Sequence, residues 1–483
     1  MPRYTIALLI AIGSLTTASA DRPNILFVLT EDQGAHMSFL GTPGLQTPNM
    51  DRLAKSGTYF HNAFVAYPVC SASKAALYTG LHSHTNGILN NTHNYHKPAD
   101  KVTAEEHGRQ LAKTNRVRDQ YLTLTEILKD AGYYQGVTHK LHVLPNVKFP
   151  YDEFLGGSRA ELAGFIDRAK ERPWFLMVNI PYSHRPYPNS DKTPIRVDPA
   201  AVELPAYLPD APPVRKDWAE YLAGVEKADQ VTGDALDVLA ESGESDNTIV
   251  IFMSDHGPTF QHGKMTLYDL GLRVPLIVRV PGMKSGSSKT LVSEIDLLPT
   301  LMELCGLTRN FDYPMHGQSI ATTLRHEGSA KEREYVFAEI SNRGPLPNDG
   351  MQERSVFDGR WKMIYRERVE TAWRQVNADS RQFKVWGNRT YATTIRLKKE
   401  FPRQYQILAE MDPQNLRAAV PRIELYDVVR DPDEMNNLAD DLQYTAIRQE
   451  LAGALKRWVI QTSDPAVSVE KIEAVTNPPT LAR

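Results

Sequence analysis

The nine residues from Asn24 to Asp32, Asn-Ile-Leu-Phe-Val-Leu-Thr-Glu-Asp, join an apolar run to two acidic side chains. The run Ile25–Leu29 is typical of a strand buried on both faces, as in parallel sheets. Similar runs occur at Tyr133–Val137, Phe175–Ile180 and Thr248–Met253. Helical patterns alternate with them at Pro48–Ser56, Ser73–Thr79, Leu124–Ala131 and Asp217 to about Ser242. This alternation predicts an α/β fold with a mainly parallel sheet between helices.

The pattern changes after about residue 335. Short strand-like pieces and a helical tail follow there, at Tyr335–Ile340, Trp361–Tyr365 and Tyr444–Ile460. A chain of 483 residues, 41% of them hydrophobic, is long enough for one large domain and a smaller one. We therefore expect an N-terminal domain over residues 21–334 and a C-terminal α+β subdomain over residues 335–483.

Residues 1–20 have the pattern of a secretory signal peptide. Arg3 precedes the apolar stretch Ile6–Ile12, and Ala18-Ser19-Ala20 supplies the small residues of a cleavage site. The stretch is too short to span a bilayer, and the mean hydropathy of −0.40 excludes a multispan membrane protein. We expect an exported protein, in a periplasm, the extracellular space or a lysosome-like lumen, with no membrane span.

Charge and cysteine content exclude two further classes of protein. The chain has 55 Lys and Arg against 58 Asp and Glu, so no basic excess exists to hold nucleic acid. The two cysteines, Cys70 and Cys305, are too few for a disulfide-stapled scaffold. Cys305 lies in an apolar helical run, Leu297–Leu307, where a buried inert thiol is expected.

Polar side chains follow each of the four predicted strands. They are Glu31 and Asp32; His139, Lys140 and His142; Ser183, His184 and Arg185; and Asp255, His256 and Gly257. Each group alone has an ordinary structural explanation, such as a helix N-cap or a turn. The carboxyl ends of parallel strands share one edge of a sheet, however, so the four groups should converge. Three carboxylates from two strands favour Ca²⁺ or Mg²⁺ over Zn²⁺.

Cys70 precedes the predicted helix Ser73–Thr79. A side chain there is close to the positive end of the helix dipole, which stabilises a developing anion. Ser71 or Ser73 could cap the helix, and Lys74 lies one turn inside it. Two interpretations stay open on these residues alone: a capped helix with a buried cysteine, or a nucleophile beside a metal.

These motifs resemble the type I sulfatases of the alkaline-phosphatase superfamily, over nearly the whole chain. The family's active-site pattern Cys-x-Pro-x-Arg corresponds here to Cys70-Ser71-Ala72-Ser73-Lys74, with Ala72 for Pro and Lys74 for Arg. Further matching stretches are Thr47-Pro48-Asn49-Met50-Asp51, Ser254-Asp255-His256-Gly257, Arg273-Val274-Pro275 and Asp296-Leu297-Leu298-Pro299. Within the family the chain is similar to the N-sulfoglucosamine sulfohydrolases (heparan N-sulfatases), through Lys140-Leu141-His142-Val143, Trp458 and Asp464-Pro465.

The resemblance implies an alkaline-phosphatase-like fold: a large mixed, mainly parallel sheet sandwiched by helices. It also implies that a maturation enzyme converts Cys70 to formylglycine. The implied ligands of one Ca²⁺, with Mg²⁺ less favoured, are Glu31, Asp32, Asp255, His256 and the modified Cys70. Glu31 stands where the family more often has Asp, which lengthens one ligand arm.

The resemblance further implies a role for each remaining polar side chain. One hydroxyl of the hydrated formylglycine would attack sulfur while Lys140 and Lys264 offset the charge on the sulfuryl oxygens. His184 would protonate the leaving amine or alcohol, and His142 would remove a proton to release sulfate. Lys74, in place of Arg, offers one flexible point charge instead of a planar fork.

The implied function is removal of N- or O-sulfate from a sulfated glycan. Segment 354–403, with 13 Lys and Arg against 5 Asp and Glu, could form the wall for such an anionic ring or simply a solvated basic face with some core aromatics. Its aromatic residues are Trp361, Tyr365, Trp373, Phe383, Trp386 and Tyr391. Two alternatives stay open: a phosphatase or phosphodiesterase of the same superfamily, and a non-catalytic glycan-binding relative. The oligomeric state is not indicated.

Overall fold

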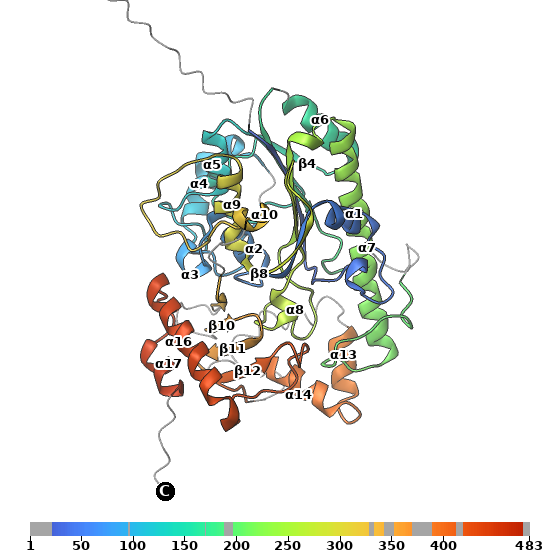
Figure 1. Ribbon diagram of the computed structural model, residues 1–483, viewed down its shortest axis with the longest axis vertical. Coiled ribbons are helices and arrows are strands. Elements are labelled where there is room, and N and C mark those ends of the chain that lie inside the picture. Colours follow the sequence, from blue (N-terminus) through green and yellow to red (C-terminus); the bar gives the residue numbers. More distant parts are fainter. Residues whose placement is uncertain are drawn as a thin grey trace, which may run out of the picture.

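Strand β1 (Asn24–Thr30) lies inside an eight-stranded sheet, and all seven of its residues are buried (Figure 1). The computed structural model describes residues 22–94, 97–169, 171–187, 197–327, 333–341, 352–369, 389–411 and 419–476. The sheet order is β4 (Glu153–Leu155), β3 (Tyr134–Thr138), β5 (Trp174–Ile180), β1, β6 (Thr248–Ser254), β7 (Leu276–Arg279), β2 (Thr58–Phe64) and β8 (Gly286–Ser293). Because β7 alone of these eight runs antiparallel to its neighbours, the expected mixed, mainly parallel sheet is confirmed.

Alternate residues of β1 supply two separate cores, as the pleat of a strand requires. Ile25, Phe27 and Leu29 belong to the core on one face, and Leu26 and Val28 to the core on the other. The strand pairs in parallel with β5 on one side and with β6 on the other. Burial on both faces explains the continuous apolar run in the sequence.

Helices cover both faces of this sheet (Figure 1). The first core includes residues of α2 (Cys70–Thr79), α5 (Leu124–Asp130), α9 (Leu297–Leu304) and α10 (Ala321–Leu324). The second includes residues of α1 (Pro48–Ser56), α6 (Arg159–Ala169) and α7 (Pro212–Glu241). The remaining described helices are α3 (Ser83–Asn86), α4 (Ala104–Leu111), α8 (Asp269–Leu272), α13 (Arg389–Arg396), α14 (Pro402–Met411), α16 (Thr445–Thr462) and α17 (Val469–Thr476).

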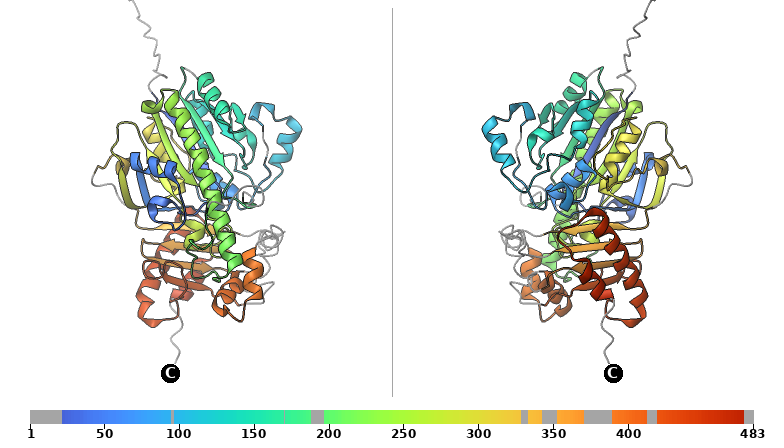
Figure 2. Two further views of the ribbon diagram at one scale, coloured as in Figure 1. Left: turned by 90° about the vertical axis from the view of Figure 1, so that its right-hand side faces the viewer. Right: turned by 90° about the vertical axis from the view of Figure 1, so that its left-hand side faces the viewer.

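A second, antiparallel sheet lies beyond the edge of the first, as both side views show (Figure 2). Its order is β12 (Ile423–Asp427), β11 (Trp361–Arg366), β10 (Glu353–Phe357) and β9 (Val336–Ile340). One face packs on α16 and α17, and the other contributes Ala338, Phe357 and Ile364 to the first core. The strands and helix predicted after residue 335 correspond to β9, β11 and α16.

The described part of the basic segment 354–403 is folded into the structure. Arg354 and Lys362 are fully buried, where they pair with Asp464 at 2.6 Å and with Glu434 at 3.0 Å. Tyr365 is also fully buried. For Arg354 and Lys362 both the solvated face and the ligand wall are wrong, because burial removes these side chains from solvent and ligand alike. Buried Tyr365 agrees with the alternative in which aromatic residues of the segment belong to the core. Trp373, Phe383 and Trp386 lie outside the described residues.

Within the described ranges, we find no helix that combines the length and the apolar composition needed to cross a membrane. The predicted signal peptide, residues 1–20, lies outside the described part of the chain.

Candidate active site

The two acidic groups predicted to converge lie side by side at the carboxyl edge of the large sheet. Glu31 and Asp32 directly follow β1, and Asp255 directly follows β6. The parallel pairing of β1 with β6 aligns these ends, and the backbone N–H of Asp32 donates to Asp255 Oδ1 at 3.0 Å. All three carboxylates are buried.

Cys70 begins helix α2 and places its thiol against this acidic group. Its Sγ lies 3.3 Å from His256 Nε2 and 3.3 Å from Lys264 Nζ. Candidate ligand atoms of Asp32, Cys70 and His184 lie within 4.8 Å of one another, as do those of Cys70, Asp255 and His256. The structure therefore brings a nucleophile-type side chain and a set of metal-ligand side chains to one point.

The expected serine cap of α2 is wrong. Val69 is the N-cap residue, and no side chain caps the helix. Ser73 Oγ instead donates to Glu294 Oε2 at 2.6 Å, and Ser71 Oγ lies 3.4 Å from Thr92 Oγ1. Both serine hydroxyls therefore bind side chains of other segments, and these tertiary contacts hold the first turn of α2 in place.

Three lysines surround the carboxylates. Lys74 Nζ and Lys140 Nζ each lie 2.8 Å from a different oxygen of Glu31. Lys264 Nζ lies 2.9 Å from Asp32 Oδ1 and so reaches both Asp32 and Cys70. These contacts give the site positive charge close to the acidic oxygens, which suits an anionic substrate group together with a cation.

The pKa shifts follow from burial opposed by these charges. Burial alone would raise the pKa of Glu31, but Lys74 and Lys140 hold it below its usual value. Burial opposes ionisation of the Cys70 thiol as well, yet Lys264 and Lys140 hold its pKa well below the ordinary range. The site thus favours negative charge at the position of the Cys70 side chain.

Burial raises the pKa of Asp255 to about 6, and His256 opposes that rise. The Asp255 Oδ2 atom is buried without a hydrogen-bond partner among the described residues, and the Lys74 ammonium lies 4.0 Å away. A buried carboxylate oxygen of this kind, beside Asp32 and Glu31, has the chemistry of a hard-cation ligand. The donor set fits a divalent cation.

His142 and His184 complete the predicted group. The His142 side chain hydrogen-bonds the Cys70 side chain, and burial lowers the pKa of this imidazole. His184, in the loop after β5, has Nδ1 against the carbonyl oxygen of Arg185. The structure brings together every side chain predicted for the site, namely Glu31, Asp32, Cys70, Lys74, Lys140, His142, His184, Asp255, His256 and Lys264.

Sequence reasoning placed Arg185 among the converging polar side chains but gave it no role, and it missed Thr259, Asp217 and Glu294, which also hold this group in place. Thr259 Oγ1 donates to Asp32 Oδ2 at 2.7 Å, and Arg185 binds Asp217 through both terminal nitrogens. Thr259 and Arg185 each lie within three residues of a predicted site residue, which is a usable signal. Glu294, the partner of Ser73, has no such signal, because it lies far away in the sequence.

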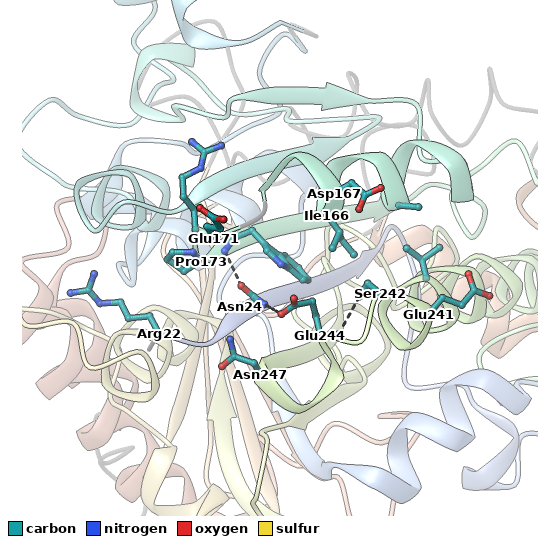
Figure 3. A pocket seen from close by; sticks show the side chains of 14 residues that line it. Arg22, Asn24, Ile166, Asp167, Glu171, Pro173, Glu241, Ser242, Glu244 and Asn247 are labelled. Carbon is teal, nitrogen blue, oxygen red and sulfur yellow. Dashed lines mark hydrogen bonds between the residues drawn. The ribbon is translucent and has the colours of Figure 1, made fainter. Parts of the chain in front are cut away.

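A cavity of about 410 Å³ lies at the other end of the strands (Figure 3). Asn24, which begins β1, lines it together with Glu171, Glu244 and Asn247. Glu31 and Asp32 follow the last residue of the same strand, so seven residues of extended chain, about 20 Å, separate the cavity from the catalytic candidates. This cavity is therefore not part of the candidate active site.

Solved structures share this architecture. A putative sulfatase from Bacteroides fragilis superposes with a TM-score of 0.70 at 18% identity, covering 95% of this chain and 100% of the other. A phosphonate monoester hydrolase of Agrobacterium radiobacter superposes with a TM-score of 0.66 at 18% identity, covering 91% of this chain and 96% of the other. These likenesses establish the fold class, which is alkaline-phosphatase-like.

The sequence comparisons identify the family. The sequence profile of the sulfatase family matches residues 23–163 and 148–307, and that of the N-sulphoglucosamine sulphohydrolase C-terminal region matches residues 257–402. The chain belongs to the sulfatase family, whose members hydrolyse sulfate esters or sulfamates.

Two curated relatives span most of the chain. The human N-sulphoglucosamine sulphohydrolase is 28% identical, over 95% of this chain and 94% of its own. An ulvan-active sulfatase of Formosa agariphila is also 28% identical, over 92% of this chain and 76% of its own. Both match this chain across the large sheet and the C-terminal sheet.

Proposed function

We propose that this protein is an exported sulfatase that removes N- or O-sulfate from sulfated glycans, with formylglycine formed from Cys70 and one bound Ca²⁺. The observation that carries the proposal is the position of Cys70 Sγ. It lies 3.3 Å from both His256 Nε2 and Lys264 Nζ, beside three buried carboxylates. We also propose that residues 21–334 form the catalytic domain and residues 335–483 a C-terminal subdomain.

The residues proposed to hold the cation are Glu31, Asp32, Asp255 and His256, together with the modified side chain of residue 70. Their oxygen-rich character favours Ca²⁺, with Mg²⁺ second. Asp255 Oδ2, which is buried and has no hydrogen-bond partner within the described ranges, supports this assignment. The cation would act as a Lewis acid on the sulfate oxygens.

Formylglycine would supply a hydrated aldehyde, whose hydroxyl is a nucleophile for sulfur. This chain's own residues would bind and orient the sulfate and move protons around it. Lys140 and Lys264 would contact sulfate oxygens and offset their charge. His184 would donate a proton to the leaving oxygen or nitrogen, and His142, beside residue 70, would accept one.

Sulfated glycans are proposed as the substrates because the relatives named above act on them. The human relative is named for N-sulphoglucosamine, and the Formosa agariphila relative is named for ulvan. A solved structure with a TM-score of 0.63 and 20% identity is described as bound to its substrate D-glucosamine-2-N,6-O-disulfate. N-sulfated and O-sulfated glucosamine are therefore the first compounds to test.

The test has two parts. Mass spectrometry of the Cys70 peptide, from protein made with a formylglycine-generating enzyme, should show one sulfur and two hydrogens exchanged for one oxygen. The matured protein should then release sulfate from N- or O-sulfated glucosamine and leave the matched sugar phosphates intact. An unmodified thiol throughout, with saccharide binding but no turnover, would contradict the proposal and favour a glycan-binding relative. Preferential phosphate release would favour a phosphatase.

A further inference from the structure

The guanidinium of Arg185 is buried and held from several directions. Its Nη1 and Nη2 donate to the two carboxylate oxygens of Asp217 at 2.8 and 2.9 Å. The Tyr187 and Phe260 rings flank it, with centroids 4.5 and 4.8 Å from Cζ. A planar cation with a two-point carboxylate contact and aromatic neighbours has one well-defined position.

Arg185 contacts the candidate active site through its backbone. The ring nitrogen Nδ1 of His184 hydrogen-bonds the carbonyl oxygen of Arg185. Because a carbonyl oxygen only accepts, Nδ1 of His184 carries the proton in this contact. The position of the Arg185 carbonyl therefore sets the tautomer and the orientation of the imidazole, and makes Nε2 the nitrogen that exchanges a proton.

A second contact of the Arg185 side chain leads to Asp32. Arg185 Nε donates to the carbonyl oxygen of Thr259 at 3.3 Å. The hydroxyl of Thr259 donates to Asp32 Oδ2 at 2.7 Å. Asp32 is also held by Lys264 Nζ at 2.9 Å, so its position does not depend on Arg185 in the way that the loop of His184 does.

The far end of this network is in the C-terminal part of the chain. Thr390, on α13, donates from Oγ1 to Asp217 Oδ2 at 2.7 Å, and both residues are buried. Asp217 is on α7, and α13 lies beside the end of α7 that points toward the second sheet (Figure 1). Arg389, also on α13, pairs with Glu220 of α7 at 2.7 Å and contacts neither Asp217 nor Arg185 in the described hydrogen bonds.

We infer that Arg185 is a positioning residue that orients His184, and that Asp217 and Thr390 hold Arg185 in its working position. This inference rests on the proposed function, in which His184 protonates the leaving group. Helix α13 therefore stabilises the position of His184 through Asp217 and Arg185, although none of its residues touches the reacting atoms.

The consequence depends on the leaving group. A sugar alcohol or amine is a poor leaving group and needs a proton as the bond to sulfur breaks, whereas 4-nitrophenolate leaves without one. A misplaced His184 should therefore slow hydrolysis of a sulfated sugar and spare 4-nitrophenyl sulfate. A general loss of structure would slow both.

The test compares Thr390→Val and Asp217→Asn with the control Arg389→Gln in the matured, calcium-loaded enzyme. We expect kcat on sulfated glucosamine to fall about 10- to 100-fold in the first two variants, as a displaced general acid requires. KM for that substrate, and both constants for 4-nitrophenyl sulfate, should change by less than about threefold. The control removes an α13–α7 contact outside the network and should leave both substrates unaffected.

Thr390→Val keeps the shape of the side chain and removes one hydrogen bond, so it decides the outcome even where Asp217→Asn does not fold. Three results in Thr390→Val would each overturn the inference. They are equal losses of kcat on the two substrates, a change in KM alone, and kinetics that do not differ from those of the wild type. Wild-type enzyme that hydrolyses neither substrate would instead overturn the proposed function, and this inference with it.

Discussion

Lys74 Nζ lies 2.8 Å from Glu31 Oε1, and each of these side chains is only 2% exposed. Both residues depart from the pattern that the sequence resembles, which more often has Asp at position 31 and Arg at position 74. In this chain the acidic side chain, Glu31, is longer than the family's Asp, and the basic side chain, Lys74, is smaller than the family's Arg. The two departures therefore compensate each other across one buried contact.

We expect Lys74→Arg and Glu31→Asp each to lower the free energy of unfolding. The larger arginine side chain overfills the buried space, and the shorter aspartate side chain no longer reaches Lys74. The double variant should recover much of the loss, with a coupling of about 1–3 kcal/mol between the positions. Urea unfolding of the wild type, both single variants and the double variant measures this. Additive losses would contradict the compensation. The exposed pair of Arg52 and Asp237 is the control, and should show no measurable coupling.

Calcium should stabilise the protein. A cation that binds only the folded chain adds about 3 kcal/mol to the free energy of unfolding at a concentration about 100 times its Kd. The melting temperature should therefore rise with Ca²⁺, rise less with Mg²⁺ and fall with EDTA. Asp255→Asn, which removes one charged ligand, should reduce the calcium shift, whereas Asp237→Asn on the surface should not. A shift with Zn²⁺ alone would contradict the assignment of the ligands.

His142→Ala should separate the first release of product from later turnovers. His142 contacts residue 70, so its loss should slow the release of sulfate more than the first release of desulfated sugar. Rapid-quench kinetics should show about one equivalent of desulfated sugar per site, followed by a rate at least about 100-fold below that of the wild type. His326→Ala, an exposed imidazole elsewhere, should keep normal turnover. Full turnover by His142→Ala would remove it from the proton-transfer role.

The buried charges between α3, β9 and β10 should make stability depend on acidity. Burial opposes ionisation of Asp464, but Arg354 lowers its pKa to about 2, and His84 lowers that of Glu339 to about 2. Both folded values lie below the unfolded ones. The stability they contribute is therefore present above about pH 4.5 and is lost as the pH falls toward about 2.

Urea unfolding between about pH 6 and pH 3 measures this loss, of which Asp464 should account for about 1 kcal/mol. Asp464→Asn removes the nearer of the two carboxylates beside Arg354 and leaves Glu339 at 3.5 Å, so it should cost about 3 kcal/mol at neutral pH and flatten the acid dependence. An unchanged acid dependence in Asp464→Asn would assign the effect to other carboxylates.

The sequence was sufficient to predict which side chains converge. Apolar runs locate parallel strands, and Glu31 and Asp255 directly follow two of them, so fold class alone places both at one sheet edge. Local patterns also predicted α1 with its observed bounds, Pro48–Ser56, because a proline at its first position marks the start.

The supporting contacts could not be predicted in the same way. Ser73 has the composition of a helix cap, but tertiary packing directs its hydroxyl to Glu294, more than 200 positions away in the chain. Arg354 and Lys362 look like surface charges, yet each meets a buried carboxylate contributed by a distant segment. Such pairings depend on how separate elements dock, which local composition does not encode.

The burial of α2 also bears on when the Cys70 side chain could be modified relative to folding. All ten of its residues are buried, and Cys70 is 1% exposed. Under the proposed function, an enzyme that modifies the Cys70 side chain could not reach it in the folded chain, so it would have to act before α2 docks against the sheet. Maturation and folding would then compete in time, and a chain that folds first would keep its thiol. Slowing the folding of this segment should raise the yield of modified protein.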